Sequence, residues 1–399
     1  MARWPSAREI LLIGAGTLFF LLGAEVILRF SPVRPSCPND PISGLWRNHP
    51  ALDYEWVPGF RWTYRGAGSP VELKISSQGL RDVEHGPPGE NEFRILTLGD
   101  SYSFARSIGP IENIWMKVLG RLLQRNMTPP WRVVTINAGV EGYGTDNELA
   151  WLRLRGSDFQ ANLVLLAFYV GNDFLDNLGF TDLRVVGGHL VRKSVVRARS
   201  ASAVLRAKVL LYSNSALYRL VTDRLRELRG KGRDAQMRAS IWNSGFADAL
   251  ASGGTPTMER AYAVTEGLMR RMKRTAEGMG GRLVLIIIPH RVQVYAEARR
   301  AWLRRMRLKE SDLDLGLPSR RLMAIARRLG IPALDLLPLF QRAALRGRVL
   351  YGLGCDDHWN ADGHAFAARA ALRFLQDESL IPNRSGRVSS EPGREIPLP

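Results

Sequence analysis

The stretch 94–103 reads RILTLGDSYS, in which a short apolar run (95–98) is followed at once by turn residues. Four more short runs of leucine or β-branched residues follow, at 133–136, 163–168, 283–288 and 331–334. Segments with helical periodicity lie between and after them, at 111–126, 145–157, 258–278, 318–329 and 361–376. This alternation predicts a three-layer α/β/α sandwich around about five parallel strands, in a flavodoxin-like arrangement. The active site of such a sheet lies beyond the carboxyl ends of its strands.

The composition is that of a folded protein with a strongly basic balance. The chain has 399 residues, a formal net charge of +18 and 45% hydrophobic residues. The charge points to nucleic acid, a membrane surface or an acidic substrate, but the sequence has no recognisable nucleic-acid motif, so no nucleic-acid partner is expected. Two cysteines, Cys37 and Cys355, are too few for a disulfide scaffold or a cysteine-based zinc site. They form either one disulfide in an exported protein or two free thiols.

An apolar segment at 10–30 is interrupted only by Glu25 and Arg29. It is long enough to cross a bilayer as a helix. A cleaved signal peptide and a buried helix are the alternatives, but residues 25–28 make poor cleavage sequence. We therefore predict a single-pass anchor in the inner membrane, with a short cytoplasmic tail (1–9) and the large domain outside. Arginines on both sides of the segment do not fix this orientation, so it depends on the shortness of the tail.

Three regions fall outside the α/β pattern. The region 31–93, rich in Pro, Gly and aromatic residues, is either a membrane-proximal collar or packed on the main domain. The interval 174–254 is too long for a simple crossover, and we predict a basic helical insertion over the site. Within it, 14 Lys and Arg residues against three acidic residues lie between 184 and 238, which predicts contact with anionic lipid or an acidic polysaccharide unless this is only a solvated surface. The tail 383–399 is predicted to be disordered.

One serine and two Asp-x-His pairs have the residue types of a nucleophilic site. Ser101 follows the first strand in a tight turn before a helix, whose N-terminus favours developing negative charge. Asp356 with His358 and Asp362 with His364 place a carboxylate two residues before an imidazole, which it can orient as a base. His364 falls inside a predicted helix and is expected to be structural. His358 lies in a loop, from which it can reach Ser101.

The second and third strands end in residues that can hold negative charge. Closely spaced glycines, Gly142 among them, follow the second strand and let backbone N–H groups approach a ligand. Asn172 follows the third strand and can donate its side-chain amide to an oxyanion. Taken singly, the glycine segment is better interpreted as a turn, and Asn172 would be unremarkable as a capping or turn residue.

Together, these segments resemble the SGNH/GDSL hydrolases, whose sequence blocks they follow in order over about 94–376. Gly99-Asp100-Ser101 resembles block I, Gly142 the block II glycine, Asn172 the block III asparagine, and Asp356 with His358 block V. The segment 77–82 also resembles the lead-in of membrane-anchored bacterial members. The Asp-x-His-Trp-Asn spacing at 356–360, with Pro289 and Gln293, is closer to the periplasmic polysaccharide O-acetyltransferases of the alginate type.

The resemblance implies a catalytic triad of Ser101, His358 and Asp356, and an oxyanion hole formed by the Ser101 and Gly142 N–H groups and the Asn172 amide. It implies no metal and no organic cofactor. The leading hypothesis is a serine ester hydrolase that acts on O-acyl groups of a carbohydrate or lipid through an acyl-enzyme. The alternative is an exopolysaccharide O-acyltransferase of the same fold. A third hypothesis is a binding module without catalysis.

Overall fold

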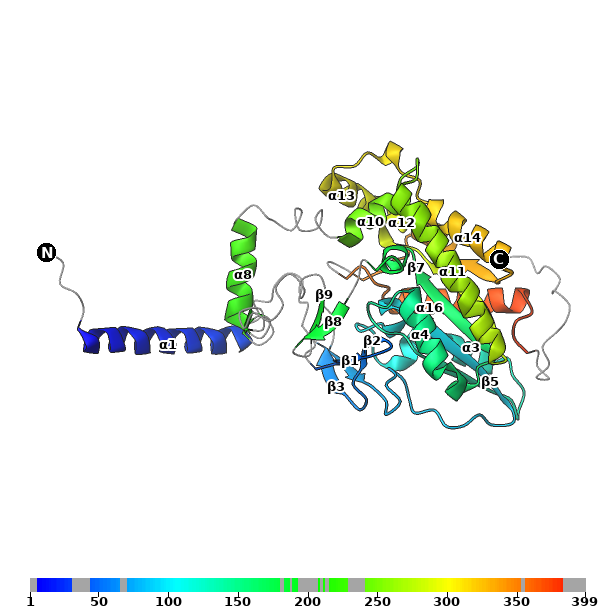
Figure 1. The fold of residues 1–399 in the computed structure, drawn as a ribbon, viewed down its shortest axis with the longest axis horizontal. Helices are drawn as coiled ribbons and strands as arrows, with labels where there is room; N and C mark the ends of the chain where they lie inside the picture. Colours follow the sequence, from blue (N-terminus) through cyan, green and yellow to red (C-terminus); the bar gives the residue numbers. More distant parts are fainter. Residues whose placement is uncertain are drawn as a thin grey trace.

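A five-stranded parallel sheet forms the centre of the molecule (Figure 1). The computed structural model describes residues 6–30, 44–64, 70–179, 183–186, 189–192, 207–208, 211, 215–228, 241–352 and 356–382. In sheet order the strands are β11 (Ala333–Asp335), β10 (Arg282–Ile288), β7 (Leu163–Tyr169), β5 (Glu92–Gly99) and β6 (Arg132–Asn137). All neighbouring pairs are parallel. This is the flavodoxin-like strand order, so the predicted α/β/α sandwich is confirmed.

Each face of the sheet buries its own hydrophobic core. Successive side chains of a strand point to opposite faces, so Leu96 and Leu98 enter one core while Ile95 enters the other. The first core also contains Met272, and the second contains Trp115. Because both faces are covered, the strands read as continuous apolar runs in the sequence.

The flanking helices form the outer layers. The Ile95 side is covered by α3 (Trp115–Gln124), α15 (Leu337–Leu345) and α16 (Ala361–Asp377). The opposite side is covered by α4 (Thr145–Arg155), α11 (Pro256–Gly278) and α14 (Leu317–Leu329). Shorter elements are α2 (Ser101–Phe104), η1 (Ile111–Asn113), η2 (Gly156–Phe159), α5 (Asp173–Asp176), α12 (Arg291–Val294) and η3 (Glu310–Asp312). Helices α13 (Ala296–Met306) and α15 were not anticipated from the sequence pattern.

The part of 31–93 that the structure describes packs against the sheet domain. It contains two antiparallel pairs, β1 (Trp46–His49) with β2 (Asp53–Trp56) and β3 (Arg61–Tyr64) with β4 (Val71–Lys74). Trp56, Leu73 and Ile75 are fully buried in the same core as Leu96, and Trp56 stacks on Phe104 with ring centroids 4.3 Å apart. Of the two interpretations of this region, the structure therefore favours packing on the main domain.

The insertion between β7 and β10 contains more than helices. Helices α8 (Ala216–Leu228) and α10 (Ile241–Leu250) are present, but β8 (Leu183–Val186) and β9 (His189–Arg192) form an antiparallel hairpin that the helical prediction missed. The β-branched pair Val185-Val186 followed by two glycines in the sequence is typical of a hairpin. Asn48 ties this hairpin to β1: its amide donates to Val185 O at 3.0 Å, and its carbonyl accepts from Val185 N at 2.9 Å.

Helix α1 (Ala7–Phe30) projects away from the sheet domain (Figure 1). Within the described chain it is the one helix long and apolar enough to cross a membrane, and its apolar side chains are exposed. The predicted apolar helix at 10–30 is thus present. Cys37, Cys355, the tail 383–399 and most of 184–238 lie outside the described residues, so the predictions made for them stay predictions.

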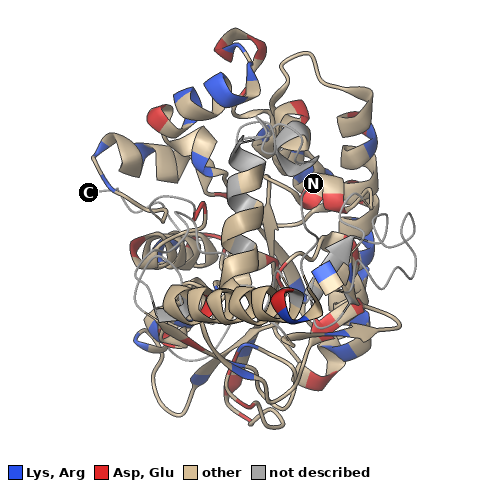
Figure 2. Cartoon of the chain, turned by 90° about the vertical axis from the view of Figure 1, so that its left-hand side faces the viewer, with Lys and Arg blue, Asp and Glu red and all other residues tan. Residues whose placement is uncertain are grey.

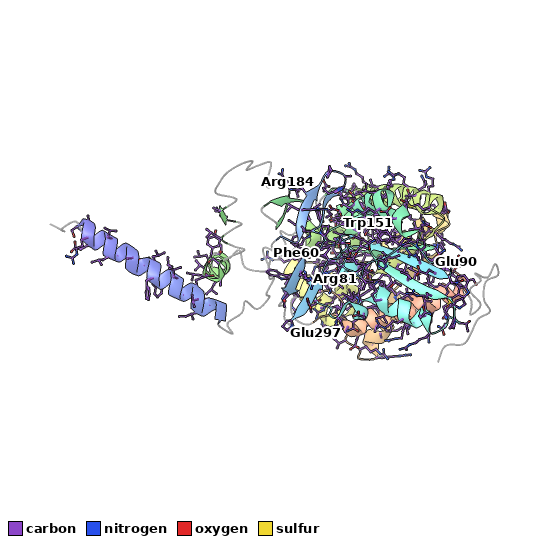
Figure 3. The ribbon with its side chains drawn as sticks, turned by 90° about the horizontal axis from the view of Figure 1, so that it is seen from below. Phe60, Arg81, Glu90, Trp151, Arg184 and Glu297 are labelled. Atoms are coloured by element: carbon purple, nitrogen blue, oxygen red, sulfur yellow. The ribbon has the colours of Figure 1, made fainter. Side chains whose placement is uncertain are left out.

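Charged side chains are spread over the described chain, with Lys and Arg interspersed among Asp and Glu (Figure 2). The two ends of the domain differ in what they present. Phe60, just before β3, and Arg184, in the β8–β9 hairpin, lie at the end that faces α1, whereas Glu90 lies at the opposite end (Figure 3). The hairpin and its neighbouring strands therefore form the side of the domain nearest to the apolar helix.

Candidate active site

A sharp turn at the end of β5 presents Ser101. Strand β5 ends at Gly99, and Ser101 is the first residue of α2. Asp100, between them, caps this short helix by accepting a hydrogen bond from Tyr102 N at 2.9 Å. Burial raises the pKa of Asp100, although the Tyr102 N–H and the charge of His358 oppose the shift. The turn places the Ser101 hydroxyl at the carboxyl edge of the sheet, where the sequence predicts the site.

Ser101, His358 and Asp356 form a continuous chain of hydrogen bonds. Ser101 Oγ lies 2.8 Å from His358 Nε2, and His358 Nδ1 lies 2.8 Å from Asp356 Oδ1. The backbone N–H of His358 also donates to Asp356 Oδ1 at 3.1 Å. The predicted partners are thus brought together across 257 positions of sequence. This arrangement can move a proton from the serine to the imidazole while the carboxylate holds the ring.

The carboxylate of Asp356 is held in its charged form. Burial alone would raise its pKa, but the hydrogen bond and charge of the His358 ring lower it well below the usual range. The His358 backbone and the Ser107 side chain contribute in the same direction. The side chains of His358 and Asp356 remain 37% and 33% exposed, so solvent reaches the pair.

His364, Asp362 and Gln293, which the sequence also pointed to, form no hydrogen bond with Ser101 or His358 in the part of the chain that the structure describes. His364 is buried in α16, where its Nδ1 accepts from Trp115 N at 3.3 Å and burial lowers its pKa to about 3. It is structural, as its place in a predicted helix indicated, and Asp362 is exposed in the first turn of the same helix. Gln293 is fully buried in α12 and donates to Leu315 O at 2.7 Å.

The three residues predicted to bind an oxyanion follow three adjacent strands. Strand β5, which leads to Ser101, lies between β6, which leads to Gly142, and β7, which leads to Asn172. Gly142 has a φ of +81°, and a Cβ there would lie 2.8 Å from Tyr54 Oη, so both the backbone and the space require glycine. The Asn172 amide donates to the carboxylate of Asp176. An amide nitrogen carries two hydrogens, so this bond is compatible with donating the second one to an oxyanion.

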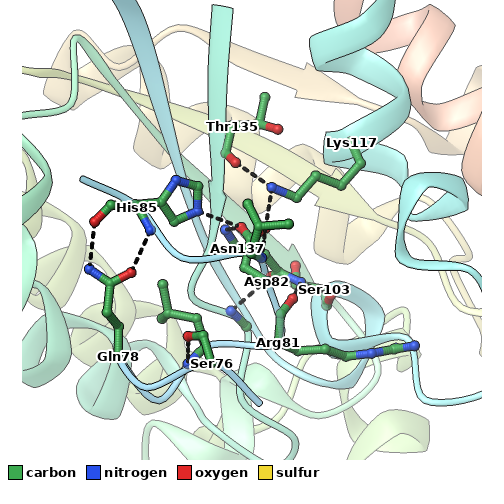
Figure 4. Close-up of polar contacts among 12 residues, drawn as sticks. Ser76, Gln78, Arg81, Asp82, His85, Ser103, Lys117, Thr135 and Asn137 are labelled. Carbon is green, nitrogen blue, oxygen red and sulfur yellow. Dashed lines mark hydrogen bonds and ion pairs between the residues drawn. The ribbon is translucent and has the colours of Figure 1, made fainter. Parts of the chain in front are cut away.

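Buried polar side chains from the segment before β5 support the turn that carries Ser101 (Figure 4). The Arg81 guanidinium is fully buried and donates to the carbonyls of Phe104, Ala105 and Ile108, where α2 ends. Burial lowers the pKa of Arg81 to about 9. Without these bonds, three carbonyls at and just after the end of α2 would lose their charged donor. The 77–82 segment therefore has a structural role at the site that spacing alone does not reveal.

Asn137 and Asp82 extend this support to the glycine loop. Asn137 donates to Ser103 O at 3.0 Å and accepts from Gly139 N at 3.0 Å, so one side chain joins α2 to the loop that carries Gly142. Asp82 accepts from Asn137 N at 2.7 Å and pairs with Lys117 at 2.5 Å (Figure 4). Burial would raise the pKa of Asp82, but His85 and Lys117 lower it.

Several buried acidic side chains beneath the site were not singled out from the sequence. Burial raises the pKa of Glu148 and of Asp173 well above the usual range, and Asp100 and Asp176 add to this effect by their charge. Asp173 accepts from Tyr169 N at 2.8 Å, which fixes the turn before Asn172. The sequence could have pointed to Asp173, because it is the neighbour of Asn172. It offered no such indication for Glu148, which lies inside an ordinary helix. Among the described residues, no group of three or more His, Cys, Asp and Glu side chains is arranged to hold a metal ion.

Comparison with known proteins points to one family. The family model for the SGNH hydrolase-like domain of the acetyltransferase AlgX matches residues 253–394, a range that includes Asp356 and His358. Residues 253–394 of the chain therefore match an SGNH hydrolase-like domain. The SGNH/GDSL resemblance predicted from the sequence, with its likeness to the alginate type, is thereby confirmed.

Two curated relatives align with part of this chain. A "Probable alginate O-acetylase AlgJ" of Pseudomonas putida is 30% identical over 130 residues, which are 33% of this chain and 31% of the relative. The protein of the same name from Pseudomonas fluorescens is 28% identical over 140 residues, 35% of this chain and 32% of the relative. The chain thus spans about a third of the length of these relatives.

Solved structures similar to this chain include esterases. TesA is 13% identical with a TM-score of 0.36, and the alignment covers 71% of this chain and 98% of TesA. A two-domain esterase active on acetylated mannans is 14% identical with a TM-score of 0.40, covering 77% of this chain and 53% of that one. The acetyl xylan esterase AlAXEase is 14% identical with a TM-score of 0.36, covering 70% and 98%.

Proposed function

We propose that this protein is a serine enzyme that transfers O-acyl groups through an acyl-enzyme on Ser101. The observation that carries the proposal is the unbroken chain of hydrogen bonds from Ser101 Oγ through His358 to Asp356. A serine hydroxyl is a poor nucleophile until a base takes its proton, and His358 Nε2 lies within hydrogen-bond reach of that proton. No metal or organic cofactor enters this reaction.

The proposed reaction has two half-reactions. Ser101 Oγ attacks the ester carbonyl as its proton passes to His358, and the N–H groups of Ser101 and Gly142 with the Asn172 amide bind the resulting oxyanion. His358 then returns the proton to the leaving alcohol, which forms the acyl-enzyme. In the second half-reaction His358 deprotonates the acceptor hydroxyl, which attacks the acyl group and frees Ser101. Asp356 holds the imidazole in one tautomer and stabilises its charged form.

The acceptor decides between the two functions that the sequence left open. Both curated relatives are named alginate O-acetylases, and the matching family model is that of an acetyltransferase. These names favour an acetyl group as the acyl group and a carbohydrate hydroxyl as the acceptor. The second candidate is hydrolysis of an O-acyl ester of a carbohydrate or lipid, which is favoured by the partial exposure of His358, because water can reach the acyl-enzyme.

The proposal includes the location of the enzyme. Helix α1 would anchor the chain in the inner membrane, with residues before it in the cytoplasm and the SGNH domain outside. An extracytoplasmic site gives access to acylated polysaccharide or lipid, the substrates proposed above.

Product analysis separates these possibilities. The full chain in detergent is incubated with p-nitrophenyl acetate, with and without neutral and acidic oligosaccharides, and the protein and products are analysed by mass spectrometry. We expect an acetyl group on Ser101 and acetylated oligosaccharide, both lost in Ser101→Ala. Free acetate without acetylated sugar would assign hydrolysis instead. If a fluorophosphonate probe failed to label Ser101, the acyl-enzyme proposal would be wrong and the binding-module hypothesis would be favoured.

A further inference from the structure

An acidic side chain of the apolar helix caps a helix of the insertion. Glu25, in α1, accepts hydrogen bonds from Ser215 Oγ at 2.9 Å and from the backbone N–H groups of Ala216 and Leu217, each at 3.0 Å. These are the first residues of α8, whose N–H groups have no partner within the helix. A carboxylate at that position also interacts favourably with the helix dipole. Glu25 therefore joins two elements 190 positions apart in sequence.

The contact between Glu25 and the start of α8 lies near the end of α1, and it sets how α8 is oriented relative to α1. A helix of 24 residues is about 36 Å long, somewhat more than the roughly 30 Å hydrocarbon core of a bilayer. Glu25 lies five residues before the end of α1, so it is about 7 Å from that end. Helix α8 begins there and runs crosswise to α1 rather than alongside it (Figure 1). If α1 stands across a bilayer, α8 lies parallel to the membrane surface.

Helix α8 also exposes apolar side chains. Val221 is 47% exposed and Leu225 is 44% exposed. They are four residues apart and so lie on one face of the helix. Leu211, just before α8, is 46% exposed as well. A hydrated polysaccharide offers little apolar surface to cover these side chains, whereas the boundary between lipid headgroups and acyl chains does.

We propose that α8 is an interfacial helix, lying in the headgroup region of the membrane with Val221 and Leu225 immersed, and that Glu25 holds it there. The proposal rests on the proposed membrane anchor, and it narrows the predicted lipid contact of 184–238 to one helix and one partner, the lipid surface. It also orients the enzyme, because the β8–β9 hairpin and the β3–β4 pair lie on the α1 side of the SGNH domain (Figures 1 and 3).

Spin labels on single cysteines test the depth of α8. The full chain, with Cys37→Ser and Cys355→Ser, is reconstituted in vesicles of equal amounts of phosphatidylethanolamine and phosphatidylglycerol. Spin labels are attached at Val221→Cys and Leu225→Cys. Leu18→Cys in α1 serves as the membrane-immersed reference, and Leu345→Cys in α15 serves as the aqueous reference. Leu345 is 89% exposed on the SGNH domain. We expect oxygen to relax labels 18, 221 and 225 more than a water-soluble nickel complex does, and the reverse at 345.

A second variant tests the role of Glu25. Glu25→Ala removes the cap. The ratio of relaxation by oxygen to relaxation by the nickel complex at labels 221 and 225 should then approach the ratio at label 345, while the ratio at label 18 is unchanged. Glu25→Gln keeps one acceptor oxygen and should give a smaller loss. If labels 221 and 225 match 345 while 18 is immersed, α8 is not interfacial and this inference is overturned although the anchor stands. If label 18 also matches 345, the anchor proposal itself is overturned.

Discussion

At the scale of single residues, the hydrogen bond between Asn172 and Asp176 predicts different effects for the two side chains: Asn172 would contact the oxyanion, and Asp176 would only position Asn172. We expect Asn172→Ala to lower kcat for acyl transfer by about 10²–10³, the usual cost of one lost oxyanion donor. Asp176→Ala should lower kcat by about tenfold with little change in KM, because the amide is no longer held in one orientation. Initial rates of p-nitrophenyl acetate turnover measure both.

The double variant decides whether Asp176 acts through Asn172. If it does, Asp176→Ala adds almost nothing once Asn172 is already alanine, since residues that act as one unit are not additive. Fully multiplicative losses would show that Asp176 affects the site by another route. Asp158→Ala, at an exposed carboxylate in η2, is the matched control and should leave the rate unchanged.

At the scale of elements, the buried histidine of α16 makes the docking of that helix sensitive to acid. Burial lowers the pKa of His364 to about 3, below the 6.5 or so of an unfolded histidine. Below about pH 6.5 the unfolded chain therefore binds a proton that the native chain does not. Stability should be complete above that pH and fall by about 1.4 kcal/mol per pH unit between pH 6 and 4 from this group alone.

His364→Asn should flatten this dependence. The asparagine carbonyl can still accept a hydrogen bond from Trp115 N, but it does not titrate. The slope of the unfolding free energy against pH should therefore decrease by about 1.4 kcal/mol per pH unit, which corresponds to one proton. Denaturant unfolding of the full chain in detergent at pH 7.5, 6, 5 and 4 measures it. Equal slopes for both proteins would contradict the assignment, and at pH 7.5 they should differ only by the change in packing.

The elements also show what a sequence can and cannot predict. The five strands were predictable because both faces of the sheet are covered, which leaves apolar runs such as Leu283 to Ile288. Helix α15 was missed because Pro338 in its first turn resembles a loop signal, although proline is well tolerated there. Helix α13 was missed because arginines interrupt its apolar pattern.

The site divides in the same way between what motifs reveal and what only packing reveals. Ser101 and His358 belong to short local patterns, and their predicted meeting depends only on the parallel sheet bringing its carboxyl ends together. The supports of the site have no such pattern. Arg81 and Tyr54 lie in a segment that reads as irregular, and their partners near Ser101 and Gly142 follow from tertiary contacts alone.

At the scale of the whole molecule, those supports imply that the catalytic unit begins before residue 94. A chain that starts at residue 44 keeps Trp56 on Phe104 and Arg81 on the carbonyls that end α2, and it should fold and react with a fluorophosphonate at Ser101. A chain that starts at residue 92 keeps every strand of the sheet but exposes the core that Trp56, Leu73 and Ile75 cover. Loss of three such side chains removes several kcal/mol of burial, comparable with the whole stability of a domain, so this chain should be unfolded. Far-ultraviolet circular dichroism and probe labelling compare the two, and cooperative unfolding with labelling of the shorter chain would show that the SGNH domain is complete without residues 44–91.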